Sequence, residues 1–339
     1  MEVLIDCYFD RLFEGMERSS LASRHRRRQL VKFFSDVINS CAEAEELDKA
    51  DVCERIVRAA LRYHTISMAE NGLVCMLGKF HNVLYVAAKL CYDWKLENNA
   101  LVAKILDDMF YCEKTFERIF VGAIFGTRVT HFLTGWKSDF DDRDDNIKAL
   151  IYFLDHAADA RLEFFCQSIS SQRRFIDVPM ESYGQVLPLR VAVQHGAPDI
   201  LLVMLRYGAS TAMDDIPPEP LEILLARLDE FEEASQCPAA LLLCLRILLR
   251  TVPVVELKVP EHLVEGCGSP KVLVYEQYPN LELWDVIPAE RSGRKPAELK
   301  HLSRCRIRQC LYDNYALPHG IRHLPIPTRL QDYVDLLED

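Results

Sequence analysis

Apolar residues in the first third of the chain recur at spacings of three and four, without the strict alternation typical of strands. The pattern is clear from Asp51 to His64 (DVCERIVRAALRYH) and from Asn82 to Trp94 (NVLYVAAKLCYDW). Such spacing puts the apolar side chains on one face of a helix that packs against its neighbours. The pattern therefore predicts that residues 1–125 form a helical region.

Five aspartates interrupt this pattern; they are Asp139, Asp141, Asp142, Asp144 and Asp145. A calcium loop is not expected, because the glycine and the final carboxylate of such a loop are missing and Arg143 stands at a ligand position. Carboxylates are favourable near the positive end of a helix dipole. The cluster is therefore interpreted as a solvated turn followed by an acidic helix start.

The stretch from Gly184 to Ser210 reads GQVLPLRVAVQHGAPDILLVMLRYGAS and resembles an ankyrin repeat. The segment that includes Pro188, Leu189 and Ala192 stands where such repeats have Thr-Pro-Leu-His-x-Ala. Gly196 occupies the turn between the two helices, and Gly208 is expected to end the second helix in a left-handed conformation. This segment is the clearest repeat in the chain.

A single repeat buries its apolar face only against neighbouring repeats, so flanking copies are expected. Asn146 to Asp159 resembles the second helix of a repeat, with Thr127 to Gly135 as its first helix. Downstream, Pro217 to Leu228 and Pro238 to Thr251 resemble another helix pair. The spacing is irregular compared with the usual period of about 33 residues, and a generic helical bundle is the alternative for these flanking units.

The C-terminal segment begins with an amphipathic helix. Leu299, Ser303 and Ile307 recur at every fourth position, with Leu302 beside them. Three arginines, Arg304, Arg306 and Arg308, are expected to lie outside this narrow apolar stripe or at its edges. A tail of about forty residues cannot bury a useful core alone, so its stripe must be covered by the rest of the chain or by another protein.

A proline-bearing step follows this helix. Leu324, Pro325, Ile326 and Pro327 form a segment in which two prolines favour an extended backbone and lower the cost of ordering on docking. A last apolar helix is then expected, with its apolar residues at Leu330, Tyr333, Val334 and Leu337.

Together these two half-motifs resemble the SOCS box, and ankyrin repeats followed by a SOCS box are the layout of the ankyrin repeat and SOCS box family. The resemblance implies that Leu299, Leu302, Ser303 and Ile307 bind elongin C of the elongin B/C pair. It also implies that Leu324, Pro325, Ile326 and Pro327 select cullin-5 with its RING-finger subunit. Two departures stand out, because Ser303 replaces the usual cysteine and Glu298 replaces a small residue or proline.

Charge and hydropathy narrow the range of partners. The net charge of -11 argues against nucleic acid or a membrane surface as the main partner. The basic run from Arg24 to Arg28 is interpreted as a solvated helix face or helix start, with a nuclear-import signal or an anion-binding patch as the alternatives. The N-terminus lacks the apolar core of a secretory signal, and no apolar span is long enough for a membrane. A cytoplasmic protein is expected.

Candidate chemistry is sparse. No phosphate loop, G-x-S-x-G or H-E-x-x-H motif occurs, so no catalytic residue and no cofactor is expected. The 12 cysteines include no C-x-x-C pair with matching histidines, and no metal site is expected. Cys305 and Cys310 point in different directions on a helix. Cys75 with His81 and Cys310 with His319 are interpreted as packing or loop residues.

The sequence thus predicts an all-α protein. Its expected parts are a helical region over 1–125, of its own class or built from degraded ankyrin-like repeats, ankyrin repeats over 126–255, a connector over 256–295 and a SOCS box of three helices over 296–339. The resemblance implies a non-catalytic adaptor that joins an unknown target protein to a ubiquitin ligase and promotes its ubiquitination and proteasomal degradation. The alternatives are an ankyrin scaffold without ligase recruitment and an enzyme hidden in the N-terminal helices.

Overall fold

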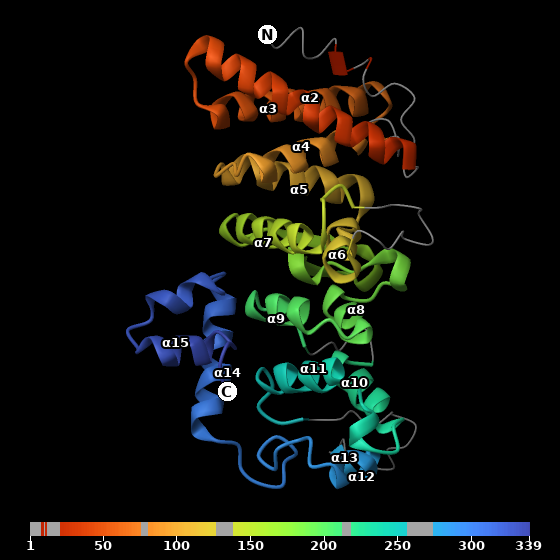
Figure 1. The fold of residues 1–339 in the computed structure, drawn as a ribbon, viewed down its shortest axis with the longest axis vertical. Helices are drawn as coiled ribbons and strands as arrows, with labels where there is room; N and C mark the ends of the chain where they lie inside the picture. Colours follow the sequence, from red (N-terminus) through yellow and green to blue (C-terminus); the bar gives the residue numbers. More distant parts are fainter. Residues whose placement is uncertain are drawn as a thin grey trace. The chain divides into compact units, whose positions relative to one another are not determined.

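The computed structural model describes residues 8–9, 11, 21–75, 81–126, 138–211, 218–255 and 274–339. The chain divides into two compact units, Met1–Gln185 and Val186–Asp339, each described here by itself. Within the described residues the fold is almost wholly helical (Figure 1), which confirms the all-α expectation. The sheet found among these residues is one antiparallel hairpin, in which β1 (Glu163–Cys166) pairs with β2 (Ser171–Arg174).

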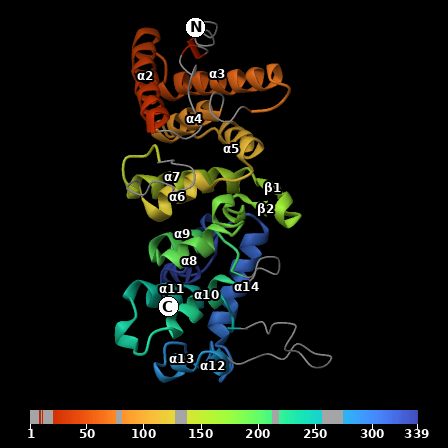
Figure 2. The same ribbon diagram turned by 90° about the vertical axis from the view of Figure 1, so that its right-hand side faces the viewer.

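The first unit is a stack of helices. Their bounds are α2 (Leu21–Glu45), α3 (Lys49–Glu70), α4 (His81–Asp93), α5 (Asn99–Glu113), α6 (Glu117–Phe125) and α7 (Arg143–Asp159). Helix α4 packs against α2, α3 and α5, and nearly all of its residues are buried as a result (Figure 2). This arrangement explains the dense apolar run in that part of the sequence, because a helix with neighbours on several sides has little polar surface.

The aspartate cluster starts helix α7, as the sequence predicts, but the expectation of a solvated turn is wrong for Asp139, which is buried. The Asp142 side chain accepts a hydrogen bond from the backbone N–H of Asp145 at 2.8 Å and so caps the helix. Asp144 and Asp145 lie in the first turn, near the positive end of the helix dipole. Helices α5 and α6 both pack against α7, whereas the first helix expected at Thr127 to Gly135 lies outside the described residues.

The interpretation of the basic run as a solvated face is wrong for Arg27. Its side chain is fully buried, and its guanidinium donates two hydrogen bonds to the carboxylate of Asp139, at 2.7 and 3.1 Å. A third, from Nη1, reaches Asn82 Oδ1 at 2.6 Å. A buried guanidinium needs such partners, so this arginine belongs to the core of the first unit. Arg28 is more exposed and pairs with Asp141.

The second unit contains the clearest repeat. Helices α8 (Pro188–His195) and α9 (Pro198–Arg206) form its antiparallel pair, and Pro188 is the first residue of α8. Gly196 ends α8 at φ 68° and Gly208 follows α9 at φ 85°, both left-handed. Leu189 and Ala192 are fully buried. Every motif residue therefore has the local conformation or burial that the ankyrin pattern requires.

The expected downstream helix pair is also present, as α10 (Pro220–Asp229) and α11 (Ala239–Leu249), which pack against each other. Helix α10 also packs against α8, and α11 packs against α9. The 3-10 helix η4 (Ala234–Gln236) lies between α10 and α11 in the sequence, and α12 (Val274–Gln277), α13 (Pro279–Leu283), α14 (Leu299–Asp313), the 3-10 helix η6 (His319–His323) and α15 (Thr328–Val334) follow. Within the described part of the chain, no helix is both long and apolar enough to span a membrane.

Candidate protein-binding site in the C-terminal helices

Helix α14 presents its apolar stripe to solvent. Leu299 is 80% exposed and Leu302 is 40% exposed, although the same helix also has a buried face. Ser303 is exposed beside them, and Ile307 is half-buried. An exposed stripe of this kind commonly marks a surface for another protein. The chain itself therefore leaves the first part of the predicted elongin-binding stripe uncovered.

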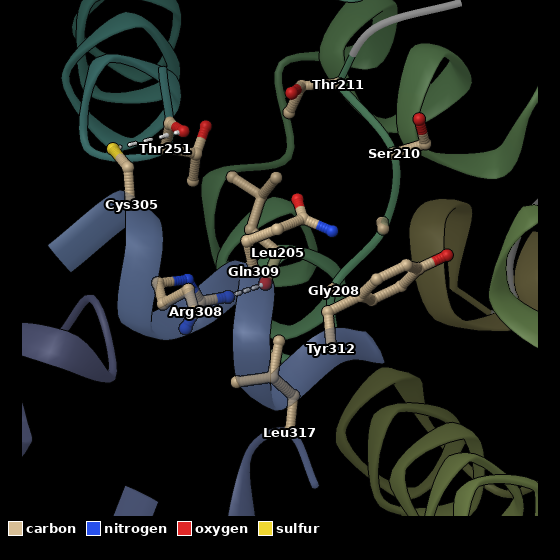
Figure 3. Close-up of a pocket in the computed structure, with 11 residues that line it drawn as sticks. Leu205, Gly208, Ser210, Thr211, Thr251, Cys305, Arg308, Gln309, Tyr312 and Leu317 are labelled. Carbon is tan, nitrogen blue, oxygen red and sulfur yellow. Dashed lines mark hydrogen bonds between the residues drawn. The ribbon is translucent and has the colours of Figure 1, made fainter. Parts of the chain in front are cut away.

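The opposite face of α14 is basic and buried, contrary to the expectation for two of its arginines. Arg304 is 3% exposed and Arg308 is 7% exposed, while Arg306 is on the surface as predicted. Arg308 donates a hydrogen bond to the backbone carbonyl of Leu205 in α9 (Figure 3). A second bond reaches the backbone carbonyl of Val334 in α15. Arg308 thus satisfies free carbonyls at the ends of these two helices, which need donors.

Burial lowers the pKa of Arg308 to about 10, and the nearby carboxylate of Asp335 opposes this change. The guanidinium is still charged at neutral pH. It links the end of the repeat helix to the end of the C-terminal helix, because one side chain reaches carbonyls of both.

Gly208 allows close contact between the repeat and α14. A Cβ atom at this position would lie 2.6 Å from Cδ2 of Tyr312 and 3.2 Å from Cδ1 of Leu317. In Figure 3, Tyr312 and Leu317 lie near the turn that carries Gly208, around a cavity of about 350 Å³ that is also lined by Cys305. The glycine that ends the ankyrin repeat thus also makes room for the C-terminal helices.

The three C-terminal helices share a small core of their own. Leu317, Ile321, Tyr333 and Val334 are buried together, and Leu324 and Ile326 pack against them. Pro325 and Pro327, by contrast, are exposed. The predicted cullin-binding segment therefore has two anchored apolar residues and two prolines that face solvent. The last apolar helix is α15, which includes Leu330, Tyr333 and Val334, whereas Leu337 lies beyond its end.

His301 is fully buried in the face of α14 that packs inward. Its Nε2 donates to the carbonyl of Val252 at 2.8 Å, and its Nδ1 accepts from Nη2 of Arg304 at 2.9 Å. Burial, with Arg291 and Arg304 nearby, lowers the pKa of His301 to about 4, although the bond to Val252 opposes the change. The imidazole is therefore neutral at physiological pH.

The hydroxyl of Ser303 bonds to the backbone of its own helix, as serine side chains in helices commonly do. Its hydroxyl donates to the carbonyl of Leu299 at 2.8 Å, one turn back. This bond satisfies the hydroxyl within the helix, so the substitution of the usual cysteine leaves no unpaired polar group in the stripe. Glu298, the second departure, is the N-cap residue of α14.

The comparisons with known proteins agree with this geometry. Residues 295–335 match the family model described as "SOCS box". The mouse protein named "Ankyrin repeat and SOCS box protein 17" is 32% identical over 167 residues, which cover 44% of this chain and 50% of that protein. Its human counterpart is 31% identical over 163 residues, with the same shares of each chain. Human "Ankyrin repeat and SOCS box protein 10" is 34% identical over 105 residues, 31% of this chain and 19% of that protein.

The chain thus spans about half the length of the first curated relatives it matches. No solved structure matches it. The resemblance to ankyrin repeat and SOCS box proteins is confirmed, and the SOCS box is identified at the C-terminus by its own family model.

Proposed function

We propose that this chain, which carries a SOCS box behind ankyrin-like helices, is a substrate-recognition adaptor of a ubiquitin ligase. Its ankyrin and helical region binds a target protein, and its SOCS box recruits elongin B/C and cullin-5 with the RING-finger subunit. Ubiquitination and proteasomal degradation of the target follow. The chain is a non-catalytic subunit, whose contribution is to raise the effective concentration of target lysines near the ligase.

One observation carries the proposal, which is that the two faces of helix α14 lie in different surroundings. Its basic face docks on the repeat through Arg308, while Leu299 and Leu302 are exposed. A helix that existed only to cap the repeats would have no need for exposed leucines at its start. An elongin-like partner that buries them would recover about 1.5–3 kcal/mol for each fully covered side chain.

The test uses Leu299→Ala, with Leu283→Ala as its matched control. Both leucines are about equally exposed, at 80% and 81%, and both belong to helices of the second unit. Neither substitution should lower the thermal stability of the free chain. We expect Leu299→Ala to reduce the affinity for purified elongin B/C by roughly 30-fold or more, and Leu283→Ala to leave it unchanged.

Calorimetric titration measures this difference directly. Equal affinity of Leu299→Ala and the parent would overturn the assignment of the stripe. Absence of any elongin binding by the parent chain would instead favour the alternative, an ankyrin scaffold without ligase recruitment.

A further inference from the structure

Side chains of types that can bind metals lie close together in the first unit, and they come from different parts of the chain. His64 of α3, Cys75 after α3 and Cys112 of α5 have their ligand atoms all within 4.8 Å of one another. Cys112 Sγ lies 3.3 Å from His64 Nε2. His64 and Cys75 are buried and Cys112 is half-buried, so the group lies inside the helical stack.

These distances suit one tetrahedral ion. Zinc binds sulfur at about 2.3 Å and nitrogen at about 2.0 Å, so a thiolate and an imidazole on one tetrahedral zinc lie about 3.5 Å apart. The separation of 3.3 Å between Cys112 Sγ and His64 Nε2 is close to this value. Small movements of the side chains are enough to complete such a geometry.

A fourth candidate ligand is His81, the first residue of α4, which is not one of the three residues grouped by the 4.8 Å distance. It is fully buried, and its imidazole interacts with the thiol of Cys75. Its Nε2 contacts the carboxylate of Glu113, and neither ring nitrogen has a hydrogen-bond partner among the described residues. A buried polar atom without a partner is costly, and Nδ1 is the atom left to bind an ion.

Both histidines have a carboxylate behind them. Asp108 Oδ2 lies 3.9 Å from Nδ1 of His64, on the side of the ring away from Cys112. Glu113, behind His81, is held by the hydroxyl of Tyr85 at 2.6 Å and by Arg118 at 2.8 Å. Carboxylates that face the outer nitrogen of a histidine orient metal-binding imidazoles and increase their basicity.

Metal binding would remove the protons of Cys75 and Cys112, because the thiolate is the form of cysteine that binds metals.

We propose that His64, Cys75, His81 and Cys112 bind a single zinc ion. Two thiolates and two imidazoles in a buried tetrahedral set favour zinc over calcium or magnesium, which prefer oxygen ligands. The four ligands come from α3, the segment after it, α4 and α5, so the ion joins three helices of the first unit. The site is structural, and it is independent of the proposed ligase function.

The first measurement is the metal content of the purified full-length chain, expressed with zinc in the medium and kept reduced. We expect about one zinc per chain. Cys75→Ser and Cys112→Ser should each lose most of it. Cys53→Ser is the matched control, because Cys53 is a buried free cysteine of the same unit outside the cluster, and it should retain the parent's zinc content.

Cobalt replacement tests the ligand set. Cobalt bound to the parent chain should show the intense visible absorption of a tetrahedral ion and the charge-transfer band of thiolate ligands. The proposal is overturned if the parent chain purifies without zinc and binds cobalt with an octahedral spectrum. It is equally overturned if mass spectrometry finds Cys75 and Cys112 joined as a disulfide in the reduced preparation, or if both cysteine variants keep the zinc. The measurements on the parent do not depend on how well the variants fold.

Discussion

Asp335, just after α15, forms a two-bond ion pair with Arg206 at the end of α9. Arg206 Nε lies 2.9 Å from Oδ1 and Nη2 lies 2.7 Å from Oδ2. The carboxylate is almost fully buried, while the arginine is about one-third exposed. The pair joins the clearest ankyrin repeat to the last helix of the SOCS box.

Replacement of Asp335 by asparagine should destabilise the second unit. The change leaves Arg206 without its charged partner at a largely buried position, and we expect a loss of about 2 kcal/mol in the free energy of unfolding. Urea denaturation of the full chain measures it. Glu338→Gln is the control, because the carboxylate of Glu338 pairs with Arg329 at the surface and such pairs contribute about 0–1 kcal/mol. Equal effects of the two substitutions would contradict the prediction.

Gly208→Ala should loosen the contact between the repeat and the SOCS box. The new Cβ would meet the ring of Tyr312 in addition to the strain of a left-handed backbone, and we expect a loss of about 2–4 kcal/mol in stability. Gly184→Ala separates the two causes, since Gly184 has φ 81° with open space around it. That control should lose only about 1 kcal/mol. Thermal unfolding compares them, and a Gly208 variant no less stable than the control would refute the close contact.

Pro325→Ala combined with Pro327→Ala should weaken cullin-5 binding without affecting elongin C. Both prolines are exposed, whereas the elongin stripe begins on a separate helix, at Leu299. The freed backbone must be ordered on docking and two ring contacts are lost, a cost of roughly 1–3 kcal/mol. The measurement is a titration of cullin-5 onto the chain bound to elongin B/C. Unchanged cullin affinity would show that the proline segment has only a packing role within the second unit.

The stability of the second unit should fall as the pH is lowered from about 6.5 to about 4. His301 has a pKa of about 4 in the folded chain and an ordinary value of 6.5, so the unfolded chain binds more protons in this range. The stability that depends on neutral His301 is fully present above pH 6.5 and is lost as the pH falls toward 4, by up to about 3 kcal/mol.

His301→Gln should flatten the dependence of stability on pH in this range, because glutamine cannot titrate. His323→Gln is the control at an exposed position, and it should leave this dependence unchanged. Urea midpoints at several pH values give both profiles. A parent profile that is flat between pH 6.5 and 4 would rule out a buried neutral imidazole.

Local features of the fold could be predicted from sequence because their causes are local. Asp142 caps α7 through its own side chain, and Gly196 and Gly208 adopt the left-handed conformation that ends a helix. The stripe that begins at Leu299 follows from helical spacing. These residues act on the backbone within one or two turns, so short stretches of sequence contain the relevant information.

Contacts between distant segments could not be predicted in the same way. The spacing of Arg304 and Arg308 predicts a basic face on α14. The neighbouring sequence does not show that this face donates hydrogen bonds to carbonyls of another helix. The contact of Arg27 could not be predicted for the same reason, because its partner Asp139 lies 112 positions away in the sequence. The cysteines and histidines of the proposed zinc site are separated by irregular intervals, and only helix packing brings them together.

The two-sided character of α14 has a consequence for protein engineering. Its inner face is matched to one particular repeat through the carbonyl of Leu205 and the turn at Gly208, and Asp335, just after α15, pairs with Arg206 of the same repeat. A SOCS box transplanted from another protein would bring its outer stripe but not these complementary contacts. The C-terminal segment is therefore not an interchangeable cassette, and chimeras should exchange the box together with the repeat that ends at Gly208.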